Sequence, residues 1–172
     1  MKTVTWSTLA ACGVTITPAV LFALEKHLQR NVYFYTPVPF TAWLDVCPGD
    51  PTPFVRALGD VDKTGTIAVE VARRAANRAR EHSRTDADGD LFMEDVWDYL
   101  TEAIGLARRG VWEDAADYAA MTTSSATWAL VQYANAAYGY PADREVRRAV
   151  QKAAREAADA AVRADIRELT GT

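Results

Sequence analysis

A short acidic segment near the middle of the chain resembles a calcium-binding loop. Residues 86–90 read Asp-Ala-Asp-Gly-Asp. Aligned with Gly89 at loop position six, the segment places aspartates at positions three and five, which supply oxygen ligands to Ca²⁺. Position one, however, falls on Arg84, whose charge repels a cation, and Asp95 at position twelve is shorter than the usual bidentate glutamate. We therefore expect a solvated loop that leads into a helix, with neither a bound metal nor another cofactor.

Histidine and cysteine are the other side chains that could carry catalysis. His27 and His82 are the only histidines, and neither has a metal-binding spacing. A catalytic pair with Cys12 or Cys47 would have to be assembled in space, and no local pattern supports one. Cys12 lies in an apolar segment and is typical of a small core residue. Phosphate-binding loops and hydrolase motifs are also missing from the sequence.

Arginine is concentrated in the segment 73–84. Its members are Arg73, Arg74, Arg78, Arg80 and Arg84. Such a stretch can contact nucleic acid or an acidic partner. The formal net charge of the whole chain is −4, which argues against a sequence-independent binder of phosphate backbones. We expect these arginines to form the solvated face of an alanine-packed helix and do not favour a nucleic-acid partner.

Aromatic residues gather along the long helix predicted from Val111 and just beyond its end. They are Tyr118, Trp128, Tyr133, Tyr138 and Tyr140. Large rings fill gaps between alanine-lined helices, but exposed rings are typical anchors of protein interfaces. The spacing of the first four need not place them all on one helical face, so we expect some to reach the surface near the turn at 139–141. We take these five as candidate partner-binding residues, and expect Tyr133→Ala or Tyr140→Ala to weaken binding or self-association while leaving the fold nearly intact.

The elements that position these residues are predicted to be helices throughout. Alanine is abundant after Ile67, and the accompanying Arg, Glu, Leu and Gln are good helix formers. Apolar periodicity and end signals predict an all-α, Ala-rich bundle of about six helices, at 5–12, 18–31, 65–82, 91–109, 111–138 and 142–169. Shorter helical turns are expected at 40–46 and at 54–58, where Gly59 would end the turn. At most one short strand is expected, near residues 32–35.

The length of 172 residues predicts a single all-helical domain spanning 1–172. A loop rich in proline and glycine at 47–53 marks a possible boundary between an N-terminal subdomain, 1–50, and a helical bundle, 53–172.

Leu9 to Cys12 matches the bacterial lipobox, but Thr3, Thr5 and Ser7 interrupt the apolar stretch that a lipoprotein signal needs. No run reaches the ~18 apolar residues of a membrane-spanning helix. We expect a cytoplasmic protein with no membrane partner.

Two ends of the chain resemble a known family. The run from Leu9 to Gly13, followed by a helix with Phe22, resembles the N-terminal motif of all-α immunity proteins of bacterial toxin systems, a family also found in phage and actinobacterial genomes. The turn at 43–45 and the ending, with Gln151 and residues 163–169, are similar to the same family. The resemblance implies an all-helical, non-enzymatic protein that binds and neutralises another protein, with no active site to carry over.

These observations support three hypotheses. The first is a helical protein–protein interaction protein of immunity, antitoxin or phage accessory (anti-defence) type, whose partner is a toxin or a defence or host protein. Its acidic surface would speed encounter with a basic toxin. The alternative is a phage or cellular structural protein that associates with itself. The third is a divalent-metal-binding protein or an enzyme that uses the acidic loop 86–95.

Overall fold

The prediction of an all-α fold is confirmed. The structure, a computed structural model, describes residues 2–83 and 87–171, with the backbone alone for 87–91. The chain is 75% helical, with eight helices and one small two-stranded sheet in the described part. In chain order the elements are β1 (Thr3–Val4), α1 (Trp6–Ala11), α2 (Pro18–Leu28), β2 (Val38–Pro39), α3 (Phe40–Val46), α4 (Thr52–Val61), α5 (Thr66–His82), α6 (Ala87–Arg108), α7 (Trp112–Ala137) and α8 (Arg144–Thr170). The count exceeds six because the segments expected as helical turns are the helices α3 and α4.

Side-chain caps begin two of the helices. Thr17 caps α2 by accepting a hydrogen bond from the amide of Val20, and Pro18 occupies the first turn. Asp143 caps α8 in the same way, accepting from the amides of the two residues at 145 and 146. These caps satisfy amides that have no partner within the helix. They therefore fix where the two helices begin.

No strand forms at 32–35, where at most one short strand is expected, and the segment contains a turn. The amide of Thr36 donates to the carbonyl of Tyr33, and the Tyr33 amide donates to the Thr36 hydroxyl. The pairing found among the described residues joins β1 to β2, with Thr3 opposite Pro39 in antiparallel register. The aromatic rings at 33–35 are exposed, so residue types that are common in strands do not belong to a buried sheet here.

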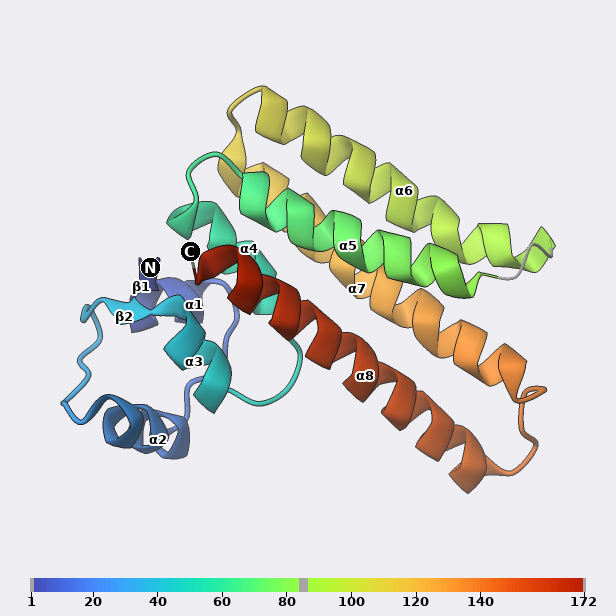
Figure 1. Cartoon of the computed structure of the whole chain (residues 1–172), viewed down its shortest axis with the longest axis horizontal. Coiled ribbons are helices and arrows are strands. Elements are labelled where there is room, and N and C mark those ends of the chain that lie inside the picture. Colours follow the sequence, from blue (N-terminus) through green and yellow to red (C-terminus); the bar gives the residue numbers. More distant parts are fainter. Residues whose placement is uncertain (1, 84–86, 172) are drawn as a thin grey trace.

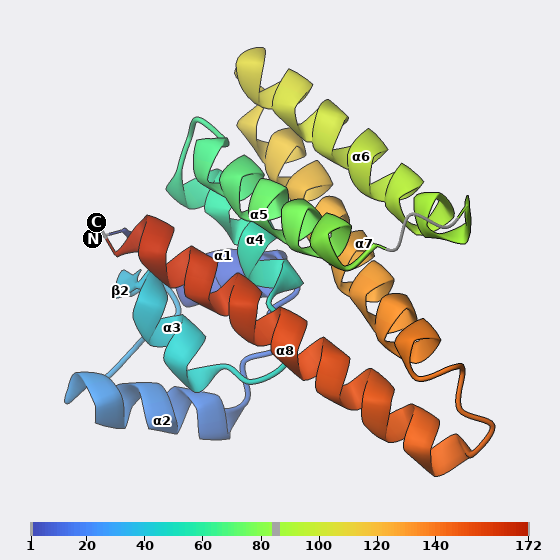
Figure 2. The same cartoon turned by 45° about the vertical axis from the view of Figure 1, so that its right-hand side comes forward.

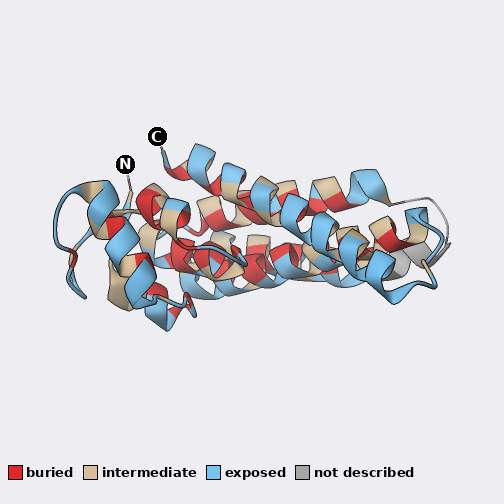
Figure 3. Cartoon of the chain, turned by 90° about the horizontal axis from the view of Figure 1, so that it is seen from below, coloured by how far each residue is buried: buried red, intermediate tan, exposed pale blue. Residues whose placement is uncertain are grey.

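Helix α7 is the centre of the bundle. It packs against α4, α5, α6 and α8, and Figure 1 shows α5, α6 and α7 running side by side, with α8 below them in a similar direction. The turned view in Figure 2 shows the N-terminal elements gathered at one end, beside the C-terminal end of α8. Buried residues follow the inward faces of the helices, as Figure 3 shows. Alanine is the commonest buried residue of both α5 and α7, and its small side chain suits close packing of helices.

Two arginines of α8 attach the N-terminal elements to the bundle. Arg163 donates to the carbonyl oxygens of Leu44 and Gly49, at 2.9 and 2.6 Å, and its guanidinium lies 5.9 Å from the centre of the Phe54 ring. Arg167 donates to Asp45 at 2.9 and 3.1 Å. The two parts on either side of the loop at 47–53 are therefore joined through the last helix.

Gly59 does not end a helix, as the sequence suggests, but lies inside α4. It is buried against α7, where a Cβ atom at this position would stand 2.8 Å from the Cβ of Ala116 and 3.3 Å from the carbonyl oxygen of Trp112. Both neighbours are rigidly attached to the backbone of α7. The absence of a side chain at residue 59 is therefore what lets α4 approach α7 so closely.

We expect Gly59→Ala to lower the free energy of unfolding by about 1–2 kcal/mol, because overpacking outweighs the gain in helix propensity. Gly105→Ala is the matched control, since Gly105 lies within α6 and its nearest neighbour is the flexible end of Arg109, at 3.4 Å. That substitution should be neutral or stabilise by about 0.5–1 kcal/mol. Urea denaturation of both variants measures the difference. Equal free energies of unfolding for Gly59→Ala and Gly105→Ala would show that α4 and α7 do not touch at Gly59.

Candidate functional site

The structure separates the five aromatic candidates. Trp128, Tyr138 and Tyr140 are 47%, 68% and 57% exposed, so these three reach the surface as expected. Tyr118 is half-buried against Tyr99 of α6, with ring centres 6.3 Å apart. The five residues therefore do not form one patch.

Tyr133 is the candidate that lies in the core of the bundle. It is only 9% exposed, and its ring meets the ring of Phe92 edge to face with centres 5.9 Å apart. Phe92 also contacts Trp128 at 5.0 Å and so lies between the two α7 rings. The expectation that Tyr133→Ala leaves the fold nearly intact is therefore wrong in its premise, because this ring packs inside the bundle.

A cavity of about 660 Å³ lies where α8 separates from the rest of the bundle. Most of its wall is alanine, and aromatic rings and two basic side chains complete it. The lining residues are Arg78, His82, Phe92, Leu130, Tyr133, Ala134, Ala136, Ala137, Tyr140, Ala154, Ala157, Ala158 and Ala161. The structure thus brings Tyr133 and Tyr140 to one cavity and leaves Tyr118, Trp128 and Tyr138 outside it. The volume lies within the usual range of ligand sites.

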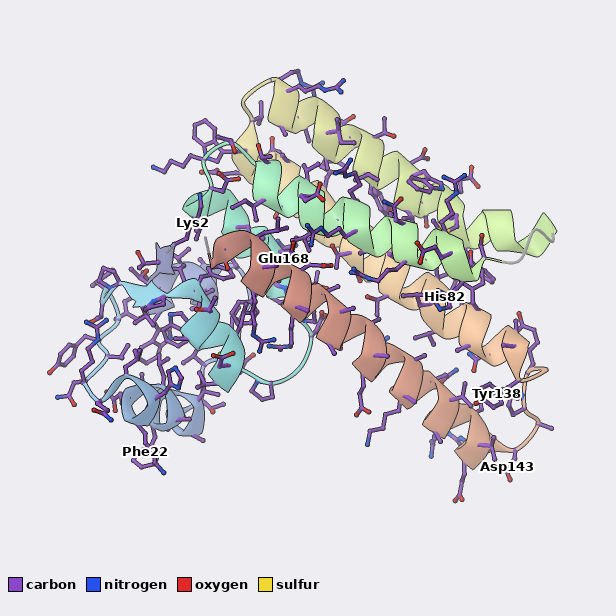
Figure 4. All side chains as sticks on the ribbon, viewed as in Figure 1. Lys2, Phe22, His82, Tyr138, Asp143 and Glu168 are labelled. Atoms are coloured by element: carbon purple, nitrogen blue, oxygen red, sulfur yellow. The ribbon has the colours of Figure 1, made fainter. Side chains whose placement is uncertain are left out.

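The cavity exists because α8 is anchored along only half of its length. All of its buried residues lie at or beyond Ala158, whereas residues 142–149 are exposed and include Val146 at 47%. His82, Tyr138 and Asp143 mark this open end of the bundle in Figure 4. Ala154, Ala157, Ala158 and Ala161 recur at the spacing of one helical face, and this spacing is the signal in the sequence that could have indicated the α8 wall of the cavity.

The two basic groups of the cavity wall are already engaged. The Nδ1 atom of His82 lies 2.8 Å from the carbonyl oxygen of Arg78. Arg78 Nη2 and Asp165 Oδ2 are 2.7 Å apart, although not aligned as a good hydrogen bond, so this contact is an ion pair. No carboxylate belongs to the lining found among the described residues. The cavity wall is therefore mainly apolar, and its two basic side chains already contact a backbone carbonyl and Asp165.

Two arginines of the segment 73–84 bind α8 instead of facing solvent. Arg74 donates to Glu168 at 2.9 and 3.1 Å and also meets Asp165 at 3.4 Å, while Arg78 pairs with the same aspartate. These hydrogen bonds raise the pKa of Arg74 and lower the pKa of Glu168. The expectation of a solvated face is therefore wrong for Arg74 and Arg78. Arg73 pairs with Glu70 on its own helix.

The thiols are in surroundings that suppress nucleophilic chemistry. Burial raises the pKa of Cys12 to about 11, with a smaller contribution from Asp60, and burial raises the pKa of Cys47 to about 11 as well. Both are free cysteines. A thiolate, the reactive form, is disfavoured at both positions.

The proposed acidic loop falls largely outside the described residues. Asp86 and Arg84 are among those not described, as are the side chains at 88 and 90. The backbone from Ala87 onward already belongs to α6, so the polar loop expected to reach residue 90 is shorter. Elsewhere in the described chain, no three His, Cys, Asp or Glu side chains gather in a way that could hold a metal ion. None of its helices is both long and apolar enough for a membrane span.

Comparison with known proteins adds no assignment to this geometry. No family model, curated protein or solved structure matches the chain. The resemblance to immunity proteins therefore stays a prediction. The open cavity between α7 and α8 is the feature from which a function has to be inferred.

Proposed function

We propose that the protein is a non-enzymatic helical interaction protein of immunity, antitoxin or phage accessory type, which binds and neutralises a partner protein in the cytoplasm. The partner inserts an apolar helix between α7 and the N-terminal half of α8. The observation that carries this proposal is the alanine-lined cavity of about 660 Å³ with Tyr140 at its edge. The two free cysteines agree with a reducing compartment.

The chemistry of the wall favours a helix over a small polar ligand. Alanine side chains leave room for the larger side chains of a partner, and an amphipathic helix inserts such residues at intervals of three and four. The cavity is open at the end where α8 diverges, and the half-exposed ring of Tyr140 can close over an inserted helix as an interface anchor. A second copy of the chain is the rival occupant.

The test fills the cavity from its rim. Ala157 lines the cavity and is exposed, so Ala157→Trp should occupy the space without disturbing the core. Ala160→Trp is the matched control, because Ala160 is exposed on the same helix but does not line the cavity. We expect Ala157→Trp to weaken binding by about thirtyfold, which corresponds to ~2 kcal/mol, and the control to bind like the wild type.

The binding partner for this test is the toxin or defence protein encoded beside the gene, produced together with each variant. Growth of the producing cells measures neutralisation, and circular dichroism with thermal melting confirms that each variant is folded. A folded Ala157→Trp variant that still protects the cells would refute the role of the cavity. If sedimentation instead shows a wild-type dimer that Ala157→Trp dissociates, the occupant is a second copy and the immunity proposal is wrong.

A further inference from the structure

A second cleft, of about 480 Å³, lies between α7 and α8 and shares no lining residue with the first cavity. Its lining residues are Trp128, Val131, Gln132, Arg148, Gln151, Lys152 and Arg155. The four α8 residues recur at intervals of three, one and three positions, which places them on one face of that helix. One wall of the cleft is therefore cationic, while the other is aromatic and uncharged.

The positive charge on this face is only partly compensated. Arg148, Lys152 and Arg155 extend over about 10 Å of helix axis. Lys152 has a distant partner in Glu156, at 3.8 Å, and Arg155 interacts electrostatically with Asp159, one turn further along α8. Among the described residues, no ion pair within 4 Å joins Arg148 or Arg155 to a carboxylate. The opposite helix cannot neutralise them, because the chain has no charged residue between Asp117 and Asp143. In a chain of net charge −4, this cleft concentrates three cations that repel one another.

Trp128 provides the other recognition element. It is 47% exposed, and the edge-to-face contact with Phe92 at 5.0 Å fixes the orientation of its ring. Within the part of the chain that the structure describes, no cation lies over the Trp128 ring. The amides of Gln132 and Gln151 line the same cleft and can donate and accept hydrogen bonds. A held aromatic ring beside cations and amides can stack a planar base while the cations bind phosphate.

We propose that this cleft binds a nucleoside polyphosphate, with its base against Trp128 and its phosphates on Arg148, Lys152 and Arg155. The cleft volume of about 480 Å³ suits a small ligand. The overall negative charge of the chain disfavours a long nucleic acid, whose many phosphates would extend beyond the three cations. The site goes beyond the proposed protein-binding function, and since the two cavities share no lining residue, each can be tested without the other.

The test measures ATP binding to the full chain by isothermal titration calorimetry at low salt. The double substitution Arg148→Ala/Arg155→Ala should weaken ATP binding about tenfold or more, because charge-assisted hydrogen bonds are lost. Arg80→Ala/Arg108→Ala is the matched control, since it removes the same charge from two exposed arginines outside the cleft, and binding should be unchanged. Trp128→Ala should also weaken binding about tenfold through lost stacking, whereas Trp128→Phe keeps a stacking ring.

Two further ligands decide the chemical class. Pyrophosphate, which lacks a base, should bind about tenfold more weakly than ATP if stacking contributes. Equal affinities for pyrophosphate and ATP would overturn the nucleoside part of the proposal. Undetectable ATP binding would overturn the proposal entirely, and so would ATP binding that is unchanged in Arg148→Ala/Arg155→Ala. If ATP does not bind, binding of a single-stranded oligonucleotide or of polyglutamate shows that the cleft takes a polymer instead.

Discussion

Tyr133→Ala is expected to lower the free energy of unfolding by about 3 kcal/mol, within the range found for large-to-small substitutions in cores. The Tyr133 ring is 9% exposed and packs edge to face on Phe92, so its removal leaves a void that the alanine-rich surroundings cannot fill. It also removes one of the two ring contacts that Phe92 of α6 makes with α7. Urea denaturation followed by circular dichroism measures the loss.

Tyr138→Ala is the matched control, because Tyr138 is the residue at the end of α7 and 68% exposed. Its truncation should change the unfolding free energy by less than about 0.5 kcal/mol, as is usual at the surface. Similar denaturation midpoints for the two variants would mean that the Tyr133 ring is not packed as the structure shows. A folded Tyr133→Ala variant with weakened partner binding would instead restore the interface role predicted from the sequence.

The second large effect is expected at Asp165, where we predict a loss of about 2–3 kcal/mol for Asp165→Ala. This carboxylate is 11% exposed and meets Arg78 at 2.7 Å and Arg74 at 3.4 Å, so its removal leaves two half-buried guanidinium groups with less compensation. The expected loss of unfolding free energy is smaller than for breaking a fully buried ion pair, since the two arginine side chains are 27% and 29% exposed. Chemical denaturation of Asp165→Ala measures this loss.

Glu168→Ala provides the control on the same helix. Glu168 also pairs with Arg74, but its side chain is 68% exposed, so water replaces most of what the pair contributes. Its loss of stability should be clearly smaller than that of Asp165→Ala. Equal losses would show that burial does not decide the strength of this network. The double variant Asp165→Ala/Arg78→Ala should lose less than the sum of its single variants, because neither charge is then left alone.

The same network predicts a dependence of stability on acid. Hydrogen bonds from Arg74 lower the pKa of Glu168 in the folded chain below its ordinary value of 4.5. A depressed pKa means that the folded state binds this proton less readily than the unfolded state, so the stabilisation is present above pH 4.5 and is lost as the pH falls through the folded-state pKa. The acid loss of stability should therefore be smaller in Glu168→Ala than in the wild type.

Helix starts could be predicted from the sequence because the information is local. Thr17 and Pro18 begin α2 through a side-chain cap and a preset backbone angle, and neither depends on a distant residue. Gly59 shows the limit of this reasoning. A glycine after an apolar turn is typical of a helix end, but the same residue also permits close approach of two helices, and only its contact with Ala116 separates these cases.

The candidate site was predicted only in part for a similar reason. Spacing shows that Tyr133 and Tyr138 differ in position on α7, but it does not show which side Phe92 covers. The partners of Arg74 and Arg78 lie about ninety residues further along the chain, on α8. Sequence patterns of three or four residues do not contain such information. The sequence predicts the all-α class and that some of these rings reach the surface, whereas the cavity depends on how α8 diverges.

The attachment of α8 to the N-terminal elements has a consequence for how the chain folds during synthesis. Arg163 and Arg167 reach partners 114 to 122 positions earlier, on or just after α3. The first third of the chain therefore leaves the ribosome long before the helix that holds it. Contacts of such long range slow folding, because a large loop must close before they form. Until α8 is complete, the apolar surface around Phe54 can associate with other chains. Docking of the last helix covers this surface and so ends the period in which the folding chain is prone to aggregate.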